Sequence, residues 1–94
     1  MTEADFLRNS LVQSAVYRQL AIIGEAARRV SEPFQSAHPE IMWKSWIDFR
    51  NVLVHAYDGI DDVRVWAVIV NEIEGLRTAA LGLIDDLLQG LNDD

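Results

Sequence analysis

Four polar residues near the middle of the chain have the side-chain types that acid–base and phosphate chemistry require. They are Arg50, Asn51, His55 and Tyr57, within the segment Arg50-Asn51-Val52-Leu53-Val54-His55-Ala56-Tyr57. If this segment is helical, Asn51 and His55 lie four residues apart on one face. Arg50 precedes His55 by five residues, which is about 140° around an ideal helix. Arg50 and His55 therefore meet only if the helix ends near His55, if the arginine reaches across, or if the segment faces its copy in a second subunit.

Histidine and arginine together suit the cleavage of RNA by its own 2′-hydroxyl group. That reaction needs a proton acceptor that works near neutral pH, and histidine titrates in that range. It also needs a fixed cation for the phosphorane charge, and arginine stays charged and grips phosphate oxygens in a fork. We therefore assign Arg50 as the phosphate-binding cation and His55 as the proton-transfer residue, and we assign Asn51 to orienting His55 or the phosphate. This chemistry requires no metal ion and no cofactor.

Other interpretations of these residues remain open from their types alone. An arginine and a histidine on a buried helix more often form a satisfied polar network or a contact with the helix C-terminus. Tyr57 taken alone is more often a packing residue with a bonded hydroxyl. His38 precedes Pro39 in a turn, and we expect it to be structural. The tryptophans follow the apolar rhythm, so we expect core positions for all of them: Trp43, Trp46 and Trp66.

Length and composition favour a small protein that assembles with a partner. A chain of 94 residues forms one domain, here residues 1–94. A domain this small buries only about 60–65% of the surface that its unfolded chain exposes, so it is marginally stable unless a disulfide, a metal ion or a second subunit stabilises it. The chain has no cysteine, which removes disulfides and fits a reducing cytoplasm, and 50% of its residues are apolar, which favours oligomerisation. No apolar run approaches the roughly 18 residues of a membrane span, so we expect a cytoplasmic protein without membrane association.

Charge is distributed unevenly along the sequence. The net charge of −7 argues against indiscriminate binding of nucleic acid, which phosphate neutralisation by lysine and arginine drives. From Arg8 to His55, however, six bases stand against four acids, whereas from Asp58 onward nine acids stand against two bases. This asymmetry allows a local basic cleft in an acidic protein. A solvated acidic C-terminal region is the alternative interpretation.

Apolar periodicity and capping signals predict an all-α protein, an antiparallel helical bundle. No segment shows the alternating pattern of a strand. Pro33 bends the chain near Ser31-Glu32, and Asp58-Gly59 signals a turn. The expected helices are a short one starting at Thr2–Asp5, one from Leu11 to Val30 opened by a capping box of Asn9-Ser10 with Gln13, one turn at Phe34–His38, one from Trp43 to Val54, and a last long one capped by Asp61 and ended by Gly90 and Asn92.

The helix from Leu11 to Val30 carries two apolar stripes. One stripe comprises Val12, Val16, Leu20, Ile23, Ala27 and Val30, and the second comprises Leu11, Ala15, Ile22 and Ala26. A helix that is apolar on two sides packs within its own bundle and against another subunit, so we predict a homodimer. Gly24, with small neighbours, would permit a close helix approach.

The central segment resembles the R-x4-H-x-Y signature of HepT-like HEPN toxins. Arg50, His55 and Tyr57 match the fixed positions of that signature. The resemblance covers most of residues 8–75, and further blocks that carry it are Ile22–Ser31, His38–Ile41, Trp43-Lys44 and Val65-Trp66.

This resemblance implies a HEPN bundle, a twofold dimer whose two motifs face each other, and a metal-independent endoribonuclease that is the toxin of a toxin–antitoxin pair. It also implies a cognate antitoxin, a minimal MntA-like nucleotidyltransferase that adenylylates Tyr57. Phosphate charge added beside Arg50 would neutralise its fork and block an RNA phosphate. The alternative is a noncatalytic HEPN module that docks a nucleotidyltransferase. A purely structural dimerisation domain would leave Asn51, His55 and Tyr57 unexplained.

The sequence departs from the family pattern at two places. Family members usually carry a further N-terminal helix ahead of the segment that begins here at Thr2, so we expect a bundle without that first helix. Ala56 stands where glycine is frequent, which stiffens the link between His55 and Tyr57.

Overall fold

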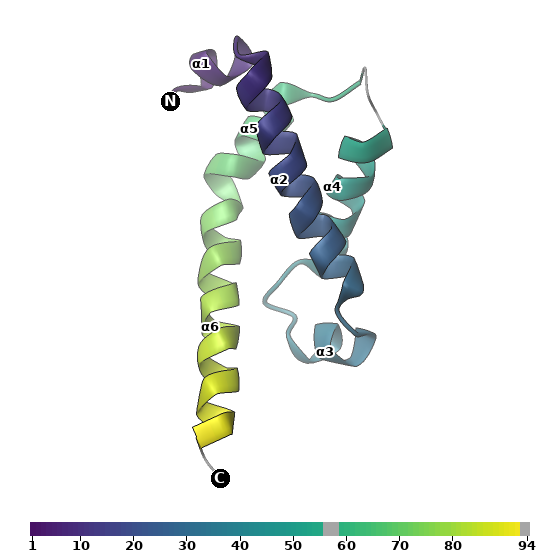
Figure 1. The fold of residues 1–94 in the computed structure, drawn as a ribbon, viewed down its shortest axis with the longest axis vertical. Coiled ribbons are helices and arrows are strands. Elements are labelled where there is room, and N and C mark those ends of the chain that lie inside the picture. The colour runs from purple at the N-terminus through teal and green to yellow at the C-terminus, as the bar shows by residue number, and fades with distance from the viewer. Residues whose placement is uncertain (56–58, 93–94) are drawn as a thin grey trace.

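Within residues 1–55 and 59–92, which the computed structural model describes, the chain forms helices and no strand (Figure 1). The prediction of an all-α protein is therefore confirmed. The elements are α1 (Glu3–Leu7), α2 (Ser10–Arg29), α3 (Glu32–Ala37), α4 (Trp43–His55), α5 (Asp62–Asn71) and α6 (Ile73–Asn92).

Side-chain caps explain where the first helices begin. Thr2 and Asp5 form a reciprocal capping box at α1. At α2 the Asn9 side chain accepts a hydrogen bond from the Val12 N–H at 3.1 Å. The predicted closure of that second box by Gln13 is wrong, because the Asn9 N–H already donates to the Phe6 carbonyl. The Gln13 amide instead donates to the same carbonyl at 3.0 Å and ties α2 to α1.

The chain bends after α2 near Ser31-Glu32, as predicted, whereas Asp58 of the predicted Asp58-Gly59 turn lies outside the described residues. The Ser31 side chain caps α3 by accepting from the Phe34 N–H, and Pro33 lies in the first turn, where its missing N–H costs no helical bond. The Asp61 carboxylate caps α5 by accepting from the N–H groups of the next turn.

The prediction of one last long helix is wrong, because this region forms two helices, α5 and α6. The chain bends at Glu72, whose φ of −114° departs from helical values. Backbone hydrogen bonds still run across the bend, from the Glu72 N–H to the Val68 carbonyl and from the Leu76 N–H to the Glu72 carbonyl. Since no proline or glycine occupies position 72, no local signal marks the bend. The end that was predicted at Gly90 and Asn92 falls at Asn92, the last residue of α6, with Gly90 inside the helix.

Helices α2 and α4 run antiparallel and pack along each other, and α5 and α6 return in the opposite direction to α4 (Figure 1). The contact between α2 and α4 is closest at Gly24. A Cβ atom on that residue would lie 2.2 Å from the Arg50 Cβ and 2.6 Å from the Trp46 carbonyl oxygen. The predicted close approach at Gly24 is thus made with α4 of the same chain.

The core joins one face of α2 to the inner faces of the other helices. The first stripe of α2 faces inward as predicted, with Leu20 and Ala27 buried. The Tyr17 hydroxyl donates to the Asp62 carboxylate and so connects α2 with α5. The buried core residues are Phe6, Leu20, Ala27, Ile41, Trp46, Phe49, Leu53, Val65 and Leu83.

Two apolar surfaces remain exposed. The second stripe of α2 faces solvent, with Leu11 84% and Ile22 49% exposed. The C-terminal half of α6 extends away from the other helices (Figure 1). From position 81 onward α6 exposes a row of large side chains: Leu81, Ile84, Leu87, Leu88 and Leu91. Among the described residues, no helix is both long enough and apolar enough to cross a membrane.

Candidate active site

The last two turns of α4 present Asn51 and His55 to solvent. Both side chains are exposed, whereas Leu53 between them is buried and anchors this end of the helix in the core. The helix ends at His55, within one residue of the prediction. Because the chain stays helical from Arg50 to His55, these two residues keep the angular separation of about 140° that an ideal helix gives them.

The Arg50 side chain turns toward α2 and is only 25% exposed. Its Nη2 lies 3.4 Å from Glu25 Oε2, and its Nη1 donates a hydrogen bond of 3.0 Å to Asn51 Oδ1. In the part of the chain that the structure describes, Arg50 makes no polar contact with His55. The chain thus holds the predicted cation and the predicted proton-transfer residue on the same helix without bringing them together.

Glu25 gathers three guanidinium groups at the end of α2. Arg28 contacts both oxygens of its carboxylate, at 2.7 Å and 3.2 Å, and Arg29 Nε lies 3.2 Å from Oε1. The hydrogen bonds from Arg28, then those from Arg29 and the charges of Arg28 and Arg50, lower the pKa of Glu25 to about 2. Three positive charges against one negative charge leave this Glu25 cluster with a net charge of +2 at neutral pH, so it can attract a phosphate although the chain is acidic.

Glu25 is not among the residues predicted for the site, although two features of the sequence pointed to it. Arg28 and Arg29 follow Glu25 by three and four residues, the spacing at which helical side chains meet. Glu25 also directly follows Gly24, the residue that allows the closest approach of α4. The sequence alone does not reveal which residue of α4 packs against Gly24 and pairs with Glu25.

Tyr57, the predicted site of modification, and Ala56 lie outside the described residues. The role assigned to Tyr57 therefore stays a prediction.

The remaining aromatic candidates and His38 occupy structural positions. The His38 ring packs on Phe34 with 4.4 Å between ring centroids, and its Nδ1 lies 3.2 Å from Glu40 Oε1. The His38 carbonyl accepts a hydrogen bond of 2.9 Å from Trp43 Nε1. Trp46 is buried in the core, and Trp43 and Trp66 are partly buried against it.

The all-α fold, with Arg50 and His55 five residues apart on α4, is consistent with the HEPN-like bundle that the sequence resemblance implies. The family model described as "Ribonuclease HepT-like" matches residues 1–81, and the chain belongs to this HepT-like ribonuclease family.

Curated relatives carry names that agree with this family. Over 73 residues the chain is 34% identical to "Putative RNase MJ1380" of Methanocaldococcus jannaschii and 40% identical to "Probable ribonuclease HepT" of Thermococcus cleftensis. Over 92 residues it is 32% identical to "Gamma-glutamylcyclotransferase and putative RNase MJ0434" of M. jannaschii.

The matched regions cover 78% of this chain in the first two relatives and 98% in the third. They cover 67%, 66% and 41% of the relatives themselves, so the chain spans about two thirds of two relatives and less than half of the third. No solved structure matches the chain.

Proposed function

We propose that this protein is the toxin of a toxin–antitoxin pair and that it cleaves RNA without a metal ion at a site composed of two subunits. The observation that carries the proposal is the placement of Arg50 within the net-positive Glu25 cluster, on the helix whose exposed last residue is His55. Membership of the HepT-like ribonuclease family supports it.

In the proposed reaction the neutral His55 imidazole accepts the proton of the RNA 2′-hydroxyl. The 2′-oxygen then forms a bond to the neighbouring phosphorus, and the bond from phosphorus to the 5′-oxygen breaks. The departing 5′-oxygen takes up a proton from water, and the His55 imidazolium returns its proton to the solvent, so the products are a 2′,3′-cyclic phosphate and a free 5′-hydroxyl. Arg50 binds the non-bridging oxygens, whose charge grows in the transition state, and Asn51 holds the guanidinium through its side-chain oxygen.

A homodimer would combine Arg50 of one subunit with His55 of the other. Within a protomer Arg50 faces α2, on a different side of α4 from His55, so the copy across a twofold axis is the nearest source of the missing group. The exposed apolar faces of α2 and α6 support assembly, because a monomer rarely leaves this many large apolar side chains in water.

Regulation would act through Tyr57, two residues beyond His55 in the sequence. A cognate MntA-like nucleotidyltransferase would transfer adenosine monophosphate from ATP to the Tyr57 hydroxyl, releasing pyrophosphate. Each group adds about one negative charge, and a charge acts strongly on the Arg50 guanidinium when it comes within the Debye length, about 8 Å at physiological salt. The modified site would then repel the RNA phosphate.

The test is incubation of the purified protein with RNA, beside the Arg50→Ala and His55→Ala variants. We expect the unmodified protein to cleave and both variants to be inactive. If the unmodified protein does not cleave but binds its nucleotidyltransferase, the proposal is wrong, and the chain is the noncatalytic docking module instead.

A further inference from the structure

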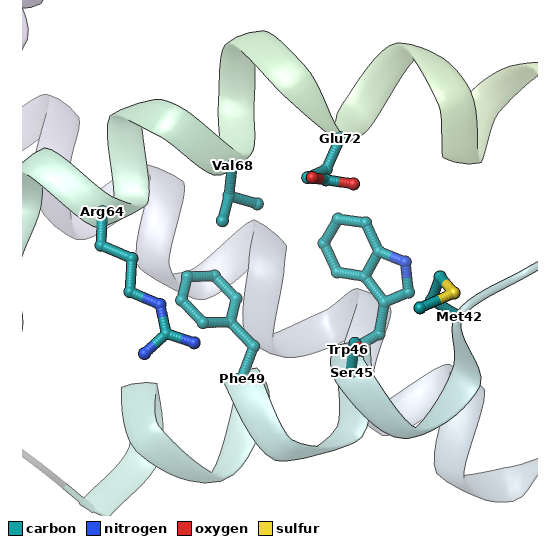
Figure 2. A pocket seen from close by; sticks show the side chains of 7 residues that line it. All are labelled: Met42, Ser45, Trp46, Phe49, Arg64, Val68 and Glu72. Atoms are coloured by element: carbon teal, nitrogen blue, oxygen red, sulfur yellow. The ribbon is translucent and has the colours of Figure 1, made fainter.

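A pocket of about 310 Å³ lies between α4 and α5, and no residue of the Glu25 cluster lines it (Figure 2). This volume is at the lower end of the range for small-molecule sites. The residues that line the pocket are Met42, Ser45, Trp46, Phe49, Arg64, Val68 and Glu72. None of them belongs to the R-x4-H-x-Y signature.

The floor of this α4–α5 pocket is aromatic. Trp46 and Phe49 are each 7% exposed, and Figure 2 shows both rings pointing from α4 into the space beneath α5. The Arg64 guanidinium carbon lies 5.7 Å from the centre of the Phe49 ring, within the range of a cation–π contact. Arg64 is thereby held at one end of the pocket, and the Glu72 carboxylate lies at the other end, beside Trp46.

Three polar groups at the α4–α5 pocket make no side-chain hydrogen bond or ion pair with residues 1–55 or 59–92: the Trp46 indole N–H, the Arg64 guanidinium and the Glu72 carboxylate. The contrast with Trp43 is informative, since the Trp43 N–H donates to the His38 carbonyl. Since no buried side-chain polar atom of the described residues lacks a partner, the Trp46 N–H is open to the pocket, where water or a ligand can accept its hydrogen bond.

We propose that the α4–α5 pocket binds one base of single-stranded RNA and prefers guanine. Splayed RNA bases stack on aromatic side chains or on arginine and are recognised through their Watson–Crick edges. The edge of guanine places two N–H donors beside the O6 acceptor. The Glu72 carboxylate can accept from both donors, and the Trp46 N–H can donate to O6. No other RNA base offers two adjacent donors to a carboxylate.

The location suits a substrate subsite, and this inference rests on the proposed RNA cleavage. Phe49 is the neighbour of Arg50 in the sequence and precedes His55 by six residues, or about 9 Å along the helix axis. A strand whose phosphate lies at Arg50 can therefore place a nearby base in the pocket. Arg64 is exposed and is available to the phosphate that follows that base.

The test is binding of each of the four nucleoside 5′-monophosphates, followed by NMR through the assigned indole N–H signals of the tryptophans. We expect guanosine monophosphate to shift the Trp46 signal most and to leave Trp43 unchanged. Glu72→Gln, an exposed substitution, should weaken guanosine monophosphate binding about tenfold. Glu74→Gln, in the first turn of α6 and outside the pocket, should leave guanosine monophosphate binding unchanged.

Binding and cleavage separate the two proposals. His55→Ala should bind guanosine monophosphate as the unmodified protein does, because binding needs no proton transfer. If no nucleotide shifts the Trp46 signal at millimolar concentration, or if all four bind equally with and without Glu72→Gln, the pocket proposal is overturned while RNA cleavage stands. Guanosine monophosphate binding by a protein that does not cleave RNA would overturn the proposed ribonuclease function and, with it, the role of the pocket as a substrate subsite.

Discussion

Gly24 and Arg50 face each other so closely that a side chain at position 24 would collide with the backbone-proximal part of Arg50. The Cβ atom of an alanine at this position would lie 2.2 Å from the Arg50 Cβ, which cannot move without α4. This crossing fixes the point at which the Arg50 side chain leaves the interface, directly beside Glu25. The position of the Arg50 side chain on α4 is therefore set by a glycine on another helix, Gly24 on α2.

Gly24→Ala should destabilise the protein by about 1–3 kcal/mol, since overpacking outweighs the gain in helix propensity. Urea unfolding followed by circular dichroism measures the effect. The matched control is Gly82→Ala in α6, where no atom lies within 4 Å of the added Cβ, and it should stabilise the chain by up to about 1 kcal/mol. Equal stability of the two variants would contradict the close crossing.

His55→Ala should lower RNA cleavage by a factor of about 10² to 10⁴, the usual contribution of a positioned proton-transfer group, while helicity is retained. His38→Ala is the control, because His38 packs on Phe34 in the turn after α3 and should keep the activity of the folded protein. EDTA should not inhibit cleavage. Loss of helicity in parallel with loss of activity would assign His55 a structural role.

Mixing two inactive variants tests the composite site directly. If each site takes Arg50 from one subunit and His55 from the other, a dimer of an Arg50→Ala chain with a His55→Ala chain contains one intact site. Subunit exchange between equal amounts should restore roughly a quarter of the cleavage rate, since half the dimers are mixed and each has one working site. No recovery after exchange, confirmed by mass spectrometry of mixed dimers, would place both residues in one subunit.

The apolar faces predict which substitutions separate the subunits. Ile22 is 49% exposed on α2, and Leu88 is 52% exposed on α6. We expect light scattering to find a dimer at micromolar concentration and Ile22→Asp to shift it toward monomer. Leu88→Asp tests whether the exposed apolar residues of α6 belong to the same subunit interface. A monomeric unmodified protein would exclude the homodimer.

Glu25 predicts a specific loss of stability in acid. Its pKa is lowered from 4.5 in the unfolded chain to about 2, chiefly by the hydrogen bonds from Arg28, so the folded state binds the proton less tightly. The stabilisation from this group is therefore fully present above pH 4.5 and is lost as the pH falls toward 2. Unfolding midpoints of Glu25→Gln should change less across this window than those of the unmodified protein. Parallel pH profiles would contradict the assignment.

Much of the fold could be predicted from local patterns, and what could not be predicted depends on long-range contacts. Capping residues such as Asn9, Ser31 and Asp61 marked helix starts because a cap is a short-range hydrogen bond. The helix that carries Arg50 and His55 was predicted from the spacing of its apolar residues. The bend at Glu72 carries no glycine or proline, and the pairing of Glu25 with Arg50 joins residues 25 positions apart, which no periodicity specifies.

The site was only partly predictable for the same reason. Arg50, Asn51 and His55 were selected by type and spacing, but the angular separation of Arg50 from His55 becomes decisive only once α4 is known to remain helical to its last residue. The pocket between α4 and α5 was missed, because Phe49 and Arg64 meet across two helices and each looks ordinary in its own segment.

The final prediction concerns the two tyrosines of the chain, of which we expect only Tyr57 to be modified. The Tyr17 hydroxyl donates to the Asp62 carboxylate, and burial together with that hydrogen bond raises the pKa of Tyr17 to about 12. A phenol that is engaged in this way is a poor nucleophile toward ATP. Incubation with the cognate nucleotidyltransferase and ATP should add multiples of the adenosine monophosphate mass to the chain and protect RNA from cleavage. Tyr17→Phe should still be modified, whereas Tyr57→Phe should cleave RNA but resist silencing. If peptide mass spectrometry places the adduct on Tyr17, or if Tyr57→Phe is silenced normally, the assignment of Tyr57 is wrong and the partner must act by occluding the site.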